Sequence, residues 1–223
     1  MNQSLTKLKN LNALKGGLTK QWIWGDKANY FKSCDILQKV NYCIQDLNRE
    51  IDSLSEFHMK EIIYIIVLVD WIREAVDALS KVLISGLNKD FVFAKEEELT
   101  KATEYFKAIR SFVVAHPLMT NRHAKYGFDG DKICIDISCQ TSQAAKFNSD
   151  HWYKIDFDGL KKTNPDAFSD FVLYMYSRKI DGMEFFQYIK ANICDLIRVA
   201  ELNIEKLYAM DKYLNKLRKK EWI

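Results

Sequence analysis

Apolar residues recur every three or four positions over three long stretches in the first half of the chain, and this spacing predicts three helices. The stretches cover residues 26–53, 55–83 and 95–115. The middle of the second stretch is apolar on all sides, which predicts a central position for that helix. Pro117 disfavours helical geometry in the residue before it, so the third helix should end at His116.

The pattern changes to a period of two after residue 125. Isoleucines alternate with Cys134 and Asp136, and a similar alternation covers residues 153–157. A period of two is typical of short strands, so we expect a small β insertion around residues 126–158. Helical spacing resumes in two further stretches, which cover residues 165–178 and 183–220.

These patterns together predict a mostly all-α protein, a bundle of four to five long helices with a small β insertion. We expect one domain over residues 1–223, with 118–160 as the β-containing insertion. The chain of 223 residues has only 2 prolines and 8 glycines, which argues against a turn-rich all-β fold.

Composition narrows the class of protein further. Apolar residues make up 48% of the chain, enough for a substantial core. The 5 cysteines are scattered without a CxxC pair, which argues against a disulfide framework or a structural zinc site. The longest apolar run, residues 62–69, is too short to cross a bilayer. We therefore expect a cytoplasmic protein with no membrane partner and no secretory signal.

The net charge of +3 says little about partners, but basic residues gather at both ends of the chain. Residues 1–25 contain lysines and no acidic residue. Basic ends can attract phosphates, or they can simply keep a protein soluble, and the sequence leaves both explanations open.

Candidate chemistry lies at the end of the third predicted helix. On a helical wheel, Arg110 and His116 fall on opposite sides of the apolar stripe. One explanation is that Arg110 extends along the surface to water and His116 merely ends the helix. The other is that both side chains converge on a groove that binds an anion, because arginine suits phosphate and histidine exchanges protons near neutral pH.

Arg110, five intervening residues and His116, at the end of a long helix in an all-α bundle, resemble the HEPN superfamily. The signature of that superfamily is an arginine, four to six residues and a histidine, and many members are metal-independent ribonucleases of toxin–antitoxin, abortive-infection and CRISPR defence systems. The motif covers seven residues, and the helical architecture extends the resemblance loosely over most of the chain. Members that cleave RNA commonly carry Asn, Asp or His after the arginine, where this chain has Ser111.

The resemblance implies a metal-independent endoribonuclease. His116 would be the general base and Arg110 would stabilise the phosphate in the transition state, within a cleft formed by two copies of the chain. Ser111, Arg122 and His123 would bind substrate. The implied partners are RNA, a second copy and an antitoxin protein, and neither a metal nor another cofactor is expected.

The alternative is a non-catalytic helical module that binds a protein or nucleotide partner and keeps the motif only as a structural relic. In a catalytic site, Arg110 and His116 should reach solvent and lie a few ångströms apart or close to their symmetry mates. In a structural role, Arg110 should pair with a buried acid.

Overall fold

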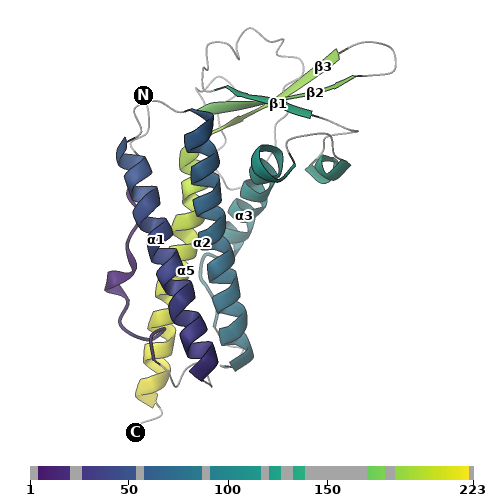
Figure 1. Ribbon diagram of the computed structural model, residues 1–223. Helices are drawn as coiled ribbons and strands as arrows, with labels where there is room; N and C mark the ends of the chain where they lie inside the picture. The colour runs from purple at the N-terminus through teal and green to yellow at the C-terminus, as the bar shows by residue number, and fades with distance from the viewer. Residues whose placement is uncertain are drawn as a thin grey trace. The chain divides into compact units, whose positions relative to one another are not determined.

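The computed structural model describes the chain in eight segments, and most of the described residues are helical (Figure 1). The segments are residues 5–20, 27–53, 58–86, 91–116, 121–126, 133–138, 170–178 and 184–220. The α-helices are α1 (Lys27–Ser53), α2 (Met59–Gly86), α3 (Glu96–Arg110) and α5 (Ile193–Lys220). The strands are β1 (Ile133–Ser138), β2 (Phe171–Arg178) and β3 (Glu184–Ala191). The short helices are η1 (Leu11–Ala13), η3 (Ser111–Ala115) and η4 (Asn121–Tyr126).

The chain forms two compact units. The first unit consists of Met1–Ser53, Val67–Leu99 and Ile197–Ile223, and the second consists of Leu54–Ile66 and Thr100–Leu196. The three predicted helices of the first half are confirmed as α1, α2 and α3, although α2 begins only at Met59.

The core of the first unit forms where α1 and the adjoining parts of α2 and α5 run side by side (Figure 1). Each helix buries one apolar stripe at the three- and four-residue spacing that the sequence predicts. The buried residues include Val40, Ile44 and Leu47 from α1, Leu68, Ile72 and Leu79 from α2, and Leu202, Leu207 and Leu214 from α5.

The N-terminal segment packs against this unit and is anchored by one carboxylate. Asp211 of α5 is 2% exposed. One of its oxygens accepts a hydrogen bond from the backbone N–H of Lys15 at 2.6 Å, and the other accepts from the N–H of Leu18 at 2.9 Å. Gly17 lies so close that a Cβ there would stand 2.2 Å from the Asp211 carbonyl oxygen. The segment therefore requires both the Asp211 carboxylate and a glycine at position 17.

The acidic run that opens α3 forms ion pairs within the first unit. Glu98 binds Arg198 of α5 at 2.7 Å, and Glu96 binds Lys206 at 2.9 Å. Arg198 also binds Glu201 at 2.9 Å, so it joins two carboxylates. The run thus has a structural role that links the start of α3 to α5.

The second unit contains a three-stranded antiparallel sheet in the order β1-β2-β3. The pairing of β1 with β2 shifts between Cys134 and Asp136, which interrupts the alternation predicted for β1. In β2, Phe171 and Leu173 are buried, and Phe171 is paired with the buried Ala191 of β3.

Part of the sequence prediction is wrong here. Helices were predicted over residues 165–178 and 183–220, but 171–178 and 184–191 are the strands β2 and β3, and α5 begins only at Ile193. The reason is that both segments are rich in aromatic residues, which favour strands when a partner strand is present. β1 lies within the predicted insertion, 118–160, whereas its other predicted strand, 153–157, lies outside the described residues. The insertion therefore stays a prediction.

A reciprocal pair of side-chain bonds closes the base of the β2–β3 hairpin at the start of α5. The backbone N–H of Ile193 donates to Oδ2 of Asp170 at 2.8 Å, and the N–H of Asp170 donates to Oδ1 of Asn192 at 3.2 Å. Burial raises the pKa of Asp170, and the Ile193 N–H partly opposes this shift. Asp170 therefore caps α5 from the start of β2.

Replacing Asp211 by alanine should lower the free energy of unfolding by about 2 kcal/mol, because the hydrogen bonds from the Lys15 and Leu18 N–H groups to the carboxylate are lost. Asp211→Asn keeps one carbonyl oxygen and should lose less. Urea unfolding gives the stability, and amide hydrogen exchange shows whether residues 15–18 open first. Thr19→Ala, at an exposed position, is the control. Unchanged exchange in Asp211→Ala would contradict the anchoring role.

Replacing Asp170 by alanine should lower the free energy of unfolding by about 1 kcal/mol through loss of the helix cap. Asp170→Asn should retain most of the stability, because a neutral amide oxygen can still accept from Ile193 N–H. Urea unfolding measures both. Equal losses in the two variants would show that the capping bond is not the source of the stability.

Candidate functional site

The end of the third helix has an unusual backbone. The helix continues beyond Arg110 to Ala115, as predicted, but its last turn, η3, is a π-helix. The turn is closed by the N–H of His116, which donates to the carbonyl oxygen of Ser111, five residues earlier, at 2.9 Å. His116 itself has φ −145° and ψ 61°, outside helical geometry. The prediction that the helix ends at His116 is therefore confirmed.

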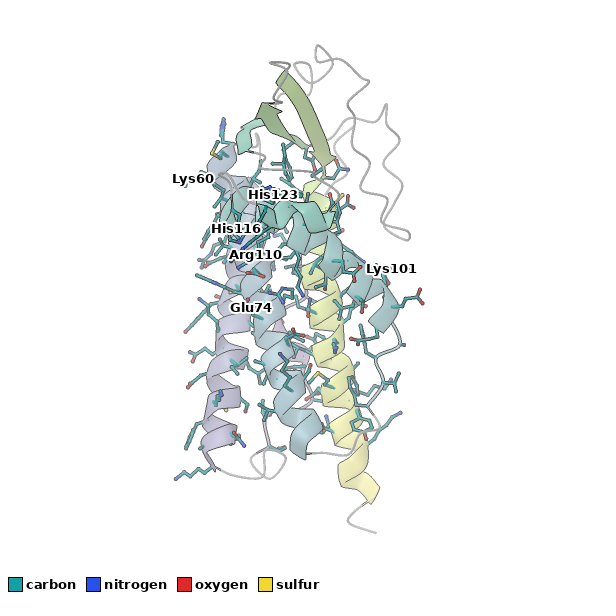
Figure 2. All side chains as sticks on the ribbon, turned by 90° about the vertical axis from the view of Figure 1, so that its right-hand side faces the viewer. Lys60, Glu74, Lys101, Arg110, His116 and His123 are labelled. Atoms are coloured by element: carbon teal, nitrogen blue, oxygen red, sulfur yellow. The ribbon has the colours of Figure 1, made fainter. Side chains whose placement is uncertain are left out.

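Single π-turns occur frequently at functional sites. In this one, the candidate residues Arg110 and His116 stand at the two ends of the turn, and both are partly exposed. Figure 2 shows Arg110 and His116, which flank this turn, together with His123 of η4. Partial exposure of both side chains meets the solvent-access condition expected of a catalytic pair.

Arg122 of η4 binds the ring of His116. Its Nη1 lies 2.9 Å from Nε2 of His116. A guanidinium can only donate hydrogen bonds, so Nε2 must be the acceptor. This assigns the neutral ring the tautomer with its proton on Nδ1.

His123, the next residue of η4, points the opposite way. Its ring has no exposed surface and packs edge-on against Phe112, with ring centroids 4.7 Å apart and planes at 77°. Neither ring nitrogen makes a hydrogen bond to another residue in the described part of the chain. Burial lowers the pKa of His123, while the nearby carbonyl of Ser111 opposes the shift and the ring of His116 adds to it.

The structure thus bonds three of the five predicted site residues, Ser111, His116 and Arg122, to one another, and packs a fourth, His123, against the same turn. Ser111 bonds to His116 through the backbone, Arg122 bonds to its ring, and His123 lies beneath. Arg110 precedes these four residues as the last residue of α3. Ser111 is 7% exposed and His123 is 0% exposed, so neither side chain is open to a substrate in this conformation. Their predicted role in substrate binding stays a prediction.

Sequence reasoning missed the π-turn and the bond between Arg122 and His116. The helical wheel assumes a constant angle per residue, and a π-turn breaks that assumption after Arg110. The only sequence signal for Arg122 was its place beside His123, just after Pro117.

In comparison with known proteins, no family model, curated protein or solved structure matches the chain. Within the described segments, no three histidine, cysteine or acidic side chains gather as a metal site. No described helix has the length and apolar character needed to cross a bilayer.

Because the pKa of His123 is lowered in the folded protein, acid should destabilise this region. Below about pH 6.5, the ordinary histidine pKa, the unfolded chain binds a proton that the folded chain excludes, so stability falls as the pH falls. His123→Phe keeps an aromatic ring against Phe112 and removes the titration, so its Tm should fall less between pH 7 and pH 5.

Thermal unfolding of the wild type and His123→Phe across that range measures the difference in slope. His58→Phe, at an exposed position of the same unit, controls for the loss of one histidine. Equal changes of slope in the two variants would contradict the role of burial. His123→Gln serves as a second variant if the phenyl ring does not fit.

Proposed function

We propose that the chain is a metal-independent endoribonuclease in which His116 is the general base and Arg110 binds the scissile phosphate. The observation that carries the proposal is the state of the His116 ring. It is partly exposed at the end of the π-turn, and its bond to Arg122 fixes the tautomer in which Nε2, the atom that would accept a proton, carries the lone pair. The resemblance of the Arg110–His116 spacing to the HEPN motif supports the same assignment.

The reaction would proceed by transfer within the RNA. Nε2 of His116 takes the proton of a ribose 2′-hydroxyl, and the 2′-oxygen forms a bond to the adjacent phosphorus. The bond from phosphorus to the 5′-oxygen breaks, and that oxygen takes a proton from water. The products are a 2′,3′-cyclic phosphate and a 5′-hydroxyl. Arg110 donates to the phosphate oxygens as charge grows on them.

The proposal extends to the assembly. Two copies of the chain would face each other with their Arg110–His116 motifs across one cleft, in the cytoplasm, with an antitoxin protein as a further partner. This part is supported by the resemblance alone.

Cleavage of labelled RNA in the presence of EDTA tests the function. The wild type should produce 2′,3′-cyclic ends, and a DNA of the same sequence should stay intact because it lacks the attacking hydroxyl. His116→Ala should reduce the rate by about 10²–10⁴-fold and Arg110→Ala by about 10²–10³-fold. The matched controls are His58→Ala and Arg49→Ala, both at exposed positions.

Cleavage that depends on added divalent ions, or that survives in His116→Ala, would contradict the mechanism. If wild type, tested alone and at concentrations that favour a dimer, leaves RNA intact, the alternative of a non-catalytic module that binds a protein or nucleotide is favoured.

A further inference from the structure

Two adjacent residues of η4 occupy opposite environments. The side chain of Arg122 is exposed and reaches the ring of His116, whereas His123 is wholly buried against Phe112. A 3₁₀-helix has three residues per turn, so neighbouring side chains diverge by about 120°. One residue can therefore fix η4 to the interior while the next extends over the surface.

The bond between Arg122 and His116 has a chemical consequence for the proposed base. The lone pair of Nε2 accepts a hydrogen bond from Nη1 of Arg122 at 2.9 Å, so it cannot at the same time take the proton of a ribose hydroxyl. In this conformation the base has the correct tautomer but is blocked.

A phosphate offers Arg122 a better acceptor than a neutral imidazole does. Hydrogen bonds between a guanidinium and an anionic oxygen are charge-assisted, roughly twice as strong as neutral ones, and often bidentate. The Arg122 side chain is exposed, so a phosphate in solvent can reach it.

We propose that Arg122 is a phosphate-operated latch on His116: without a phosphodiester its guanidinium occupies Nε2, and a bound phosphodiester draws the guanidinium away and exposes the lone pair. The latch rests on the proposed function for its purpose, because it names the trigger of the same site. The trigger is the anionic phosphodiester of the nucleic acid. Arg122 is thus a binding and positioning residue that acts through His116.

His123 holds η4 in place while the Arg122 side chain moves. It packs on Phe112 of the same π-turn that ends at His116, so η4 and the turn are held together while the Arg122 side chain swings. The backbone therefore does not need to rearrange when the latch opens.

Nitrogen NMR of the histidine rings tests the latch in the full-length protein. At pH 8, above the ordinary histidine range, the spectrum distinguishes a proton on Nδ1 from one on Nε2. In the wild type, His116 should carry its proton on Nδ1, and inorganic phosphate should shift the Nε2 resonance in a saturable way. Sodium chloride of equal ionic strength should not.

Variants separate a latch from a simple structural contact. In Arg122→Ala the Nε2 resonance should already differ from that of the wild type, and phosphate should no longer move it. Arg122→Lys retains a donor and should restore part of the response. Lys101→Ala removes one positive charge from α3 of the same unit, at the residue labelled in Figure 2, and should behave as the wild type.

Either of two results would overturn the latch: a wild-type Nε2 resonance that phosphate does not move, or an Arg122→Ala spectrum identical to that of the wild type. These measurements need no cleavage, so they are independent of the ribonuclease assay. If phosphate shifts the Nε2 resonance but the protein leaves RNA intact, the ribonuclease proposal is wrong and the latch is supported. If the protein cleaves RNA but phosphate does not shift the resonance, the latch is wrong and the ribonuclease proposal is supported.

If the wild type cleaves RNA, Arg122→Ala should raise KM about tenfold, because one charge-assisted contact to the substrate is lost. Its kcat should change much less, because His116 remains in place once substrate is bound. A large loss of kcat at unchanged KM would show that Arg122 orients His116 during the reaction, which contradicts a latch that opens.

Discussion

The hydrogen bond from the His116 N–H to the Ser111 carbonyl is the constraint on which the candidate site depends. In an α-helix this N–H would bond four residues back, to Phe112. By reaching Ser111 instead, it accommodates one extra residue in the last turn and leaves His116 outside helical geometry. The ring of His116 can then meet Arg122 of η4, while Phe112 stays buried within the same turn.

The two histidines of the site show how burial and hydrogen bonding divide their roles. His123 is buried with no bonded partner among the described residues, and burial favours its neutral form, so it behaves as an aromatic packing residue. His116 is partly exposed and is held by a cation, which fixes its tautomer. The residue suited to proton transfer is thus the one that solvent reaches, and its neighbour in space stabilises the backbone around it.

Local periodicity was enough to predict α1, α2 and α3, because each helix buries a stripe that its own sequence defines. The strands β2 and β3 could not be found in this way. A short, largely apolar run fits a helix or a strand, and the choice is made by pairing: β2 pairs with β1, more than thirty residues earlier, and β3 pairs with β2. In the candidate site, too, the features set by local sequence could be predicted and those that depend on other segments could not. Arg110 and His116 could be placed at the helix end from the sequence, but neither the π-turn nor the bond from Arg122 to His116 follows from a constant helical angle per residue.

The buried His123 lies next to the exposed Arg122 in η4, and this arrangement affects both the stability of η4 and the mobility proposed for Arg122. Arg122 can change partners only if η4 stays in place, and η4 stays in place because His123 fills space against Phe112. A polar ring without a hydrogen-bond partner in the described segments is a poor choice for stability alone, since an apolar residue would avoid the desolvation of two nitrogens. The same ring, however, lies near the backbone of Ser111 and His116, the two residues whose hydrogen bond closes the π-turn. His123 therefore contributes both ring packing and contact with the backbone of the turn, and the geometry of the proposed base, His116, is tied to the stability of that turn.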